Sequence, residues 1–320
     1  MSDASAPPGH RPESAPGPAS ARRLFRATLA GTLAVRLLLA WRFPVIGDEA
    51  YLFGWARDLA WGYYDHPPLA AWLLSPFFAF GFDSPLALRL PAVALYPLLS
   101  LVLVRLLKPF DEARAWLAGA LFLLLPVHVV GVLMLTDVVL VLLVGLAGAA
   151  LFRTVALRND ALSGYAAAGA LLGLALLTKY LAALLAAAFA VWLALSWRGG
   201  GGVPPRRRLA GFALLVACAA PFVALHLGWN ATHCWSTVLF NLFSRHAGES
   251  KNYSVPRNLV FFALAHLWVL GPPVLGYLFR PRGIRRRLAE LWRVARSDAF
   301  RPAALAFAVP TALLALSAAT

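Results

Sequence analysis

The stretch LAGFALLVACAAPFVALHLG, residues 209–228, contains no Asp, Glu, Lys or Arg. A helix needs about 20 predominantly apolar residues to cross the hydrocarbon core of a bilayer. Comparable runs recur at residues 86–106, 115–132, 136–152, 162–178, 180–197, 258–279 and 301–319. Because these runs are continuous rather than short and alternating, they argue against an outer-membrane barrel. We therefore predict an all-α polytopic membrane protein built as a bundle of transmembrane helices.

The composition excludes a soluble protein. Of the 320 residues, 61% are hydrophobic and only 13% are charged, whereas a soluble domain has about a quarter of its residues charged. The net charge of +15 would suggest nucleic acid in a soluble protein, but in a membrane protein it marks cytoplasmic loops. We therefore expect membrane lipids and no nucleic acid as partners. The two cysteines, Cys218 and Cys234, form no metal-binding spacing.

The chain divides into a tail and one membrane domain. Residues 1–21 are rich in Ser, Ala, Pro and Gly, so we predict a disordered N-terminal tail. Residues 22–320 then form the transmembrane domain. Its first apolar stretch follows three arginines, as in a signal peptide, but it lacks a small-residue cleavage site and continues to Pro44. We count it as an uncleaved span, which brings the expected total to about nine.

Basic residues follow alternate spans and so gather on one side of the membrane. They lie in the tail and in segments 105–114, 153–158, 198–208 and 280–296. The positive-inside rule assigns these segments and the N-terminus to the cytoplasm. The Ala-, Leu- and Arg-heavy composition suggests a bacterium. We therefore predict a multi-pass protein of the inner (plasma) membrane, whose other face is periplasmic or extracellular.

The opposite face carries most acidic residues that lie near span ends. It holds segment 44–85, the turns at Thr136–Asp137 and Lys179–Tyr180, and the loop 229–257. A few ionisable groups gathered at one membrane face mark a site more often than a scaffold. We therefore expect the functional site on this face.

The first segment on that face reads GDEAYLFGWARDLAWGYYDHPPLAAW, residues 47–72. Apolar and aromatic residues recur in it at helical spacing, from Leu52 to Tyr63. Its Trp and Tyr content is typical of a short helix lying in the membrane interface. Asp48 and Glu49 open this helix, and His66-Pro67-Pro68 close the segment.

These residues resemble a known family. Asp-Glu-Ala-Tyr, Trp-Gly-Tyr-Tyr-Asp-His-Pro-Pro-Leu and the later Leu-Arg-Leu-Pro at Leu88–Pro91 are similar to the membrane glycosyltransferases with the GT-C fold. More narrowly, they resemble the family 39/83 type, which includes the protein mannosyltransferases and the aminoarabinose transferase. Weaker matches follow in order at Thr136-Asp137, Leu176–Tyr180, Trp229–Trp235 and Arg245.

The resemblance implies a hexosyl- or pentosyltransferase. Such an enzyme takes a sugar from a polyprenyl-phosphate carrier and places it on a lipid, glycan or protein acceptor at the non-cytoplasmic face. In the family an acidic residue of the first external loop is the catalytic base, which corresponds to Asp48. The chemistry fits, because a carboxylate can deprotonate an attacking hydroxyl and a single displacement inverts the anomeric carbon. The departing phosphate needs cations, which Lys179 and Arg245 supply.

The candidate site is therefore Asp48 as the base, with a set of substrate-binding residues. These are Glu49, His66, Asp137, Lys179, Tyr180, His233 and Arg245. Each has a structural alternative: Asp48 and Asp137 are also favoured helix caps, Glu49 suits the helix dipole, and Lys179 can snorkel. His66 could ligate a metal, but a single His before two prolines is more typical of a packed turn. We predict no cofactor and leave a divalent ion open.

Two rival classes remain. A transporter or lipid flippase would also gather charge near a membrane face, although we find no internal repeat of the kind that transporters show. The second rival class is a catalytically silent subunit that binds polyprenyl lipid. The chain ends inside an apolar run at Thr320, whereas enzymes of this type usually continue. We therefore expect either a fragment or a short family member.

Overall fold

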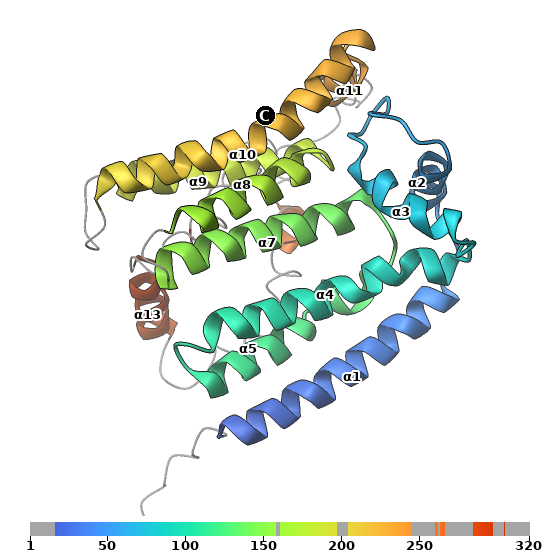
Figure 1. Ribbon diagram of the computed structural model, residues 1–320. Coiled ribbons are helices and arrows are strands. Elements are labelled where there is room, and N and C mark those ends of the chain that lie inside the picture. Colours follow the sequence, from blue (N-terminus) through green and yellow to red (C-terminus); the bar gives the residue numbers. More distant parts are fainter. Residues whose placement is uncertain are drawn as a thin grey trace, which may run out of the picture.

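The computed structural model describes residues 17–157, 161–196, 204–244, 260–261, 263–265, 284–296 and 304. Within these residues every element of regular secondary structure is a helix and no strand is found, which confirms the all-α prediction. The longer helices lie side by side (Figure 1). They are α1 (Pro18–Arg42), α4 (Pro85–Leu107), α5 (Glu112–Leu123), α7 (Thr136–Leu157), α8 (Leu162–Leu176), α9 (Ala183–Ser196) and α10 (Pro205–Thr232).

Shorter elements complete the described fold. Three of them gather at one end of the bundle (Figure 1): α2 (Gly47–Arg57), α3 (Leu69–Ala79) and α11 (Ser236–Leu239). We call this end, where α7 also begins, the site end. The remaining elements are α6 (Pro126–Val130), η1 (Tyr180–Ala182), η2 (Phe240–Ser244) and α13 (Ile284–Arg296).

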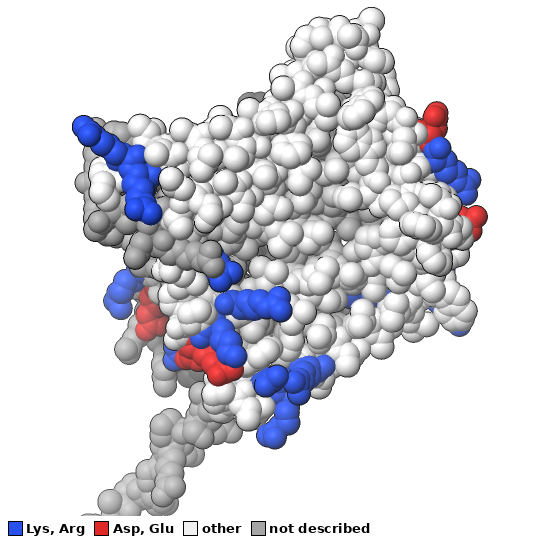
Figure 2. Space-filling view, viewed as in Figure 1, with Lys and Arg blue, Asp and Glu red and all other residues white. Residues whose placement is uncertain are grey.

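Four of the described helices are long and apolar enough to cross a membrane. They are α1, α4, α7 and α10. Figure 2 shows charged side chains gathered at the two ends of the helices, with a broad band between them that lacks charge. This distribution is the one that a bilayer requires. The fuller prediction of about nine spans is not confirmed, and residues 258–279 and 301–319, two of the predicted spans, lie almost entirely outside the described residues.

The predicted span 115–132 is broken in two. Helix α5 ends at Leu123, Leu125 is extended (φ −60°, ψ 133°), and α6 begins at Pro126. Proline has no N–H to donate to a preceding turn, and it disfavours the helical conformation in the residue before it. The break therefore falls where a proline interrupts an otherwise apolar run.

Other boundaries also differ from the prediction. Residues 18–21, expected in the tail, form the first turn of α1, where Pro18 fits because the first helical N–H groups have no partner inside the helix. The predicted helix in segment 47–72 is present as α2, but it ends at Arg57 rather than near Tyr63. Helix α3 was not predicted, because its residues were taken as part of an external segment.

Small residues allow α8 and α10 to pack closely. A Cβ atom on Gly169 would lie 2.1 Å from the carbonyl oxygen of Leu215, and one on Gly173 would lie 2.9 Å from the Cα atom of Ala219. Such close approach is typical of membrane helices, which gain little from burying apolar surface and depend on van der Waals contact. This packing forms the rigid half of the bundle from which Lys179 emerges.

A second apolar cluster anchors the site end. Leu52 and Ala56 of α2 are buried against α3, α4 and α7, where their neighbours include Leu74 and Met134. The backbone N–H of Leu69 donates to the carbonyl of Leu177, 2.9 Å away, which ties the start of α3 to the end of α8. Packing of Leu52 and Ala56 thus fixes the position of α2.

Candidate functional site

A polar cavity of about 250 Å³ lies at the site end of the bundle. Residues from separate parts of the sequence line it: Asp48, Tyr51, Leu52, Trp55, Asp65, His66, Leu135, Thr136, Asp137, Lys179 and Phe240. Four of the predicted site residues are therefore brought together, namely Asp48, His66, Asp137 and Lys179. The volume of the cavity lies just below the range of about 300–1,000 Å³ that is typical of small-molecule pockets.

Asp48 lies in the first turn of α2 and is exposed. Its carboxylate benefits from the N-terminal end of the helix dipole, which favours negative charge. The chain enters α2 through Ile46 in an extended conformation. Asp48, Tyr51, Leu52 and Trp55 then follow at spacings of three and four residues, which place their side chains along one face of the helix, and all four line the cavity. Leu52 is also buried in the core, so the same face of this short helix carries both an anchor and the reactive group.

Lys179 and Asp137 form an ion pair across the cavity. Nζ of Lys179 lies 3.0 Å from Oδ1 and 2.9 Å from Oδ2 of Asp137. Asp137 stands in the first turn of α7, and Lys179 lies in extended backbone between α8 and η1. The lysine side chain is only 17% exposed, whereas that of Asp137 is 50% exposed. The pair therefore holds a shielded ammonium group at a wall of the cavity.

Asp65 and His66 retain hydrogen-bonding capacity. Oδ2 of Asp65 lies 3.2 Å from Nδ1 of His66, yet the two do not meet with hydrogen-bond geometry. Asp65 Oδ1 and His66 Nδ1 are both buried and make no hydrogen bond to any residue that the structure describes. Buried polar atoms of this kind are usually satisfied by water or a ligand. This part of the cavity is therefore equipped to bind a polar group.

Tyr51 and Trp55 form an aromatic wall beside Asp65. Their ring centroids are 4.3 Å apart, and the Trp55 ring lies 5.4 Å from that of His66. Burial raises the pKa of the Tyr51 hydroxyl, and the nearby Asp65 charge raises it further. The phenol therefore keeps its proton at neutral pH and can act as a donor.

Glu49 lies outside the cavity, in a buried ion pair with Arg89. Nε of Arg89 lies 2.8 Å from Oε1 of Glu49, and Nη2 lies 2.5 Å from Oε2. Both side chains are fully buried, and Oε1 also accepts the N–H of Met134 at 2.8 Å. Burial alone would raise the pKa of Glu49, but the bonds from Arg89 and Met134 outweigh it and lower that pKa. The structure thus gives Glu49 an internal role rather than a substrate-binding one.

Of the three remaining predicted site residues, Tyr180 and His233 do not line the cavity. The Tyr180 hydroxyl bonds Nε2 of His226 at 2.7 Å. His233 is exposed, with its ring stacked on Trp229 at 4.2 Å. Arg245 lies outside the described residues. Conversely, Asp65, Tyr51 and Phe240 line the cavity but were not predicted. Asp65 could have been found because it precedes His66 in the sequence, and Tyr51 because it follows Asp48 by three residues on the same predicted helix.

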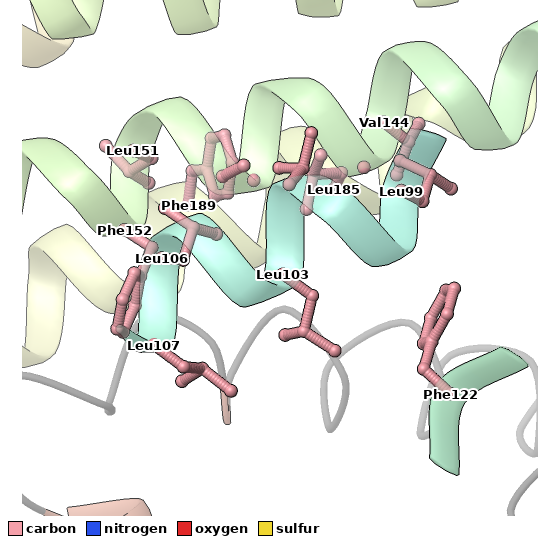
Figure 3. Close-up of a pocket in the computed structure, with 14 residues that line it drawn as sticks. Leu99, Leu103, Leu106, Leu107, Phe122, Val144, Leu151, Phe152, Leu185 and Phe189 are labelled. Atoms are coloured by element: carbon pink, nitrogen blue, oxygen red, sulfur yellow. The ribbon is translucent and has the colours of Figure 1, made fainter. Parts of the chain in front are cut away.

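A larger cavity of about 530 Å³ lies deeper in the bundle, between α4, α7 and α9 (Figure 3). Every residue that lines it is apolar, including Leu103, Val144 and Phe189. Side chains of this kind offer no acid, base or hydrogen bond to a reaction. We therefore assign the chemistry to the smaller polar cavity. Among the described residues no cluster of three or more His, Cys, Asp or Glu residues that could hold a metal ion is found.

Comparisons with known proteins identify the family of the chain. The sequence pattern of the family described as dolichyl-phosphate-mannose-protein mannosyltransferase matches residues 65–229, which is more than half of the chain. This match defines the class, a GT-C membrane glycosyltransferase, and confirms the resemblance seen in the sequence. The chain belongs to this mannosyltransferase family.

The chain is also similar to a curated relative. It is 31% identical, over 230 residues, to the lipid A galacturonosyltransferase RgtD of Rhizobium johnstonii. The aligned region is 70% of this chain but only 46% of that protein, so the chain spans less than half the length of the relative. No solved structure matches the chain.

Proposed function

We propose that this chain carries the reaction centre of a membrane glycosyltransferase, which moves a sugar from a polyprenyl-phosphate carrier to an acceptor. The observation that carries the proposal is the polar cavity, where Asp48, the Lys179–Asp137 pair and the Asp65–His66 pair meet at one end of a helical bundle. The cavity offers a carboxylate for a hydroxyl group and an ammonium group for a phosphate. Family membership supports the same assignment.

In this proposal Asp48 is the general base. An acceptor hydroxyl attacks the anomeric carbon of the donor sugar, and its proton passes to the Asp48 carboxylate. A new carbon–oxygen bond forms as the bond from the anomeric carbon to the phosphate oxygen breaks. The electron pair of the broken bond stays on the polyprenyl phosphate. A single displacement inverts the anomeric configuration, and the phosphate leaves without a general acid, unlike the alkoxide of a glycoside.

Lys179 stabilises the departing phosphate. An ammonium group has three donors, and two of them have acceptors in the Asp137 carboxylate. One donor remains for a phosphate oxygen, and a charge-assisted bond of that kind is stronger than a neutral one. Asp137 thus has a defined role: it holds the ammonium group at the cavity wall before the donor arrives. The ring nitrogen Nδ1 of His66 offers the phosphate a second donor besides the Lys179 ammonium group.

The position of the cavity suits a lipid-linked donor. It lies at the end of helices that can cross a membrane, near the exposed aromatic side chains of Tyr51 in α2 and of Trp61 and Tyr64 in the following turn. The α4–α5 connection and the start of α10, which carry many of the basic residues, lie at the opposite end (Figure 1). The positive-inside rule then puts the opposite end in the cytoplasm. We place the site at the periplasmic or extracellular face of the inner membrane.

The acceptor class follows from the relative. RgtD is named for transfer of galacturonic acid to lipid A, so a glycolipid is the first acceptor to test, ahead of glycans and proteins. Because the chain spans less than half of that protein, the sugar and the acceptor of the complete enzyme are both part of the proposal.

The experiment is a transfer assay with a panel of donors. The purified chain in detergent is incubated with radiolabelled polyprenyl-phosphate sugars that differ only in the sugar, with lipid A or a membrane extract as acceptor. Transfer from one of the donors supports the proposal and names the sugar. A folded protein that transfers none of them contradicts it and favours a lipid transporter or a silent lipid-binding subunit.

A further inference from the structure

The segment Ser236–Ser244, which we call the strap, follows the end of α10 and lines the cavity through Phe240. It comprises α11 and η2. The chain reverses before it through Cys234 and Trp235, whose φ angles are 54° and 55°. Non-glycine residues rarely adopt this left-handed conformation unless their surroundings impose it. The turn is held by the N–H of Trp235, which donates to the carbonyl of Asn230 at 2.8 Å.

The inner face of the strap contacts the turn that carries Asp65 and His66. Thr237 Oγ1 donates to the carbonyl of Tyr63 at 2.6 Å, and Asn241 Nδ2 donates to the carbonyl of Asp65 at 2.8 Å. Residues four apart lie on one face of a helical turn, so both bonds point the same way. Phe240, beside them, lines the cavity.

Further hydrogen bonds of the turn lie mainly in its first half, where the Tyr63 hydroxyl donates to the carbonyl of Trp55 at 2.9 Å and Trp72 Nε1 donates to that of Ala60 at 2.8 Å. Residues 58–68 adopt neither helix nor strand, and their hydrogen bonds include the one from the N–H of Tyr63 to the carbonyl of His66 at 3.0 Å. Backbone carbonyls outside regular structure need partners from side chains or water. Trp229 of α10 packs against the turn, since a Cβ atom on Gly62 would lie 2.4 Å from Cε3 of the Trp229 ring.

We propose that Thr237 and Asn241 are positioning residues for the donor-phosphate end of the cavity. By bonding the two carbonyls on either side of Tyr64, they fix the backbone from which the Asp65 and His66 side chains enter the cavity. The inference rests on the proposed function, because it treats that end of the cavity as the part that binds the carrier phosphate. Neither residue touches the reacting atoms.

The test measures binding of undecaprenyl phosphate to the full chain in detergent. The variants are Thr237→Val, Asn241→Leu and Thr237→Ser, which keeps the hydroxyl. Thr154→Val is the matched control, because Thr154 is also buried and its hydroxyl also donates to a carbonyl, that of Ala150, but it lies in the far half of α7. Loss of one such hydrogen bond is expected to weaken binding about three- to tenfold.

Weaker binding by Thr237→Val and Asn241→Leu, with wild-type affinity in Thr237→Ser and Thr154→Val, supports the inference. In the transfer assay the same variants then raise KM for the donor with little change in kcat. Equal affinity in all four variants, or an equal loss in Thr154→Val, overturns it.

A second readout separates this inference from the proposed function. Amide hydrogen exchange over residues 61–66 should be faster in Asn241→Leu than in Thr154→Val, whether or not the protein transfers sugar. If exchange is faster and the wild type binds the phosphate but transfers nothing, the positioning role stands while the proposed function fails. Unchanged exchange in Asn241→Leu overturns the positioning role even in an active enzyme.

Discussion

Arg89 of α4 and Glu49 of α2 form an ion pair that is closed to solvent on both sides. The same guanidinium group donates to the carbonyls of Ala40 and Phe43 at 2.8 and 2.7 Å, while Glu49 accepts the N–H of Met134. The pair thus joins the end of α1, the start of α2, α4 and the approach to α7. Asp48 lies on α2 and Asp137 on α7, so the distance between their carboxylates depends on the Glu49–Arg89 ion pair, in which neither of them takes part.

Breaking this pair should destabilise the protein strongly. Replacing Glu49 by Gln leaves Arg89 buried without a counter-charge, which typically costs about 3–5 kcal/mol. We expect a markedly lower unfolding temperature in detergent. Glu112→Gln is the matched control, since Glu112 also pairs with a cation, Lys108 at 2.8 Å, but at the surface, where such pairs contribute little. Equal unfolding temperatures for the two variants would contradict the role assigned to Glu49.

The same pair predicts a pH dependence of stability. The pKa of Glu49 in the folded protein lies below its ordinary value of 4.5. A carboxyl group whose folded pKa is lowered stabilises the protein fully above its unfolded pKa, and that contribution is lost as the pH falls through the folded pKa. The unfolding temperature of the wild type should therefore fall more steeply below pH 4.5 than that of Glu49→Gln. Parallel curves for the two proteins would argue that Glu49 is not ionised in the fold.

Lys179 is expected to act on the donor. Lys179→Met removes the ammonium group from the cavity, so we predict a rise of at least tenfold in KM for the polyprenyl-phosphate sugar. Lys108→Met removes a lysine from an ion pair between α4 and α5, at the other end of the bundle, and should leave KM unchanged. Steady-state kinetics at fixed acceptor concentration distinguish the two. The phosphate-binding role fails if both variants behave alike.

The packing of α8 on α10 gives a prediction that is independent of chemistry. Gly169→Ala would place a Cβ atom 2.1 Å from a backbone oxygen of Leu215, so the two helices must separate. Gly31→Ala in α1 meets nothing within 4 Å and should be neutral or stabilising by up to about 1 kcal/mol, since alanine favours helix. We expect Gly169→Ala alone to lower the unfolding temperature, as measured by thermal denaturation in detergent. Similar results for both would contradict the close helix contact.

Much of the bundle could be predicted from apolar runs alone. The long helices α4, α7 and α10 begin and end within a few residues of the predicted spans, because a membrane demands length and apolar character together. The break at Pro126 and the helix α3 were not predicted. At Pro126 a proline interrupts a run whose composition suited a membrane span, whereas α3, at 11 residues, is too short for the length rule that identified the spans.

The face that carries the site was predicted because ionisable groups are costly near a membrane unless they have a use or a partner. The individual residues Asp48, His66, Asp137 and Lys179 were assigned through the family resemblance, and the structure brings these four together. Glu49 follows the same rule but is satisfied internally by Arg89, and a sequence does not show which of two adjacent carboxylates turns inward. Phe240 could not be predicted, since its place depends on the turn at Cys234 and Trp235.

The central claim is that Asp48 is the catalytic base, and one comparison tests it most directly. Transfer of radiolabelled sugar is measured for the wild type, Asp48→Asn and Asp58→Asn, since Asp58 lies at the other end of the same helix and does not line the cavity. We predict that Asp48→Asn lowers kcat by at least a hundredfold, with wild-type unfolding temperature, while Asp58→Asn remains active. Substantial transfer by a folded Asp48→Asn protein would contradict the assignment.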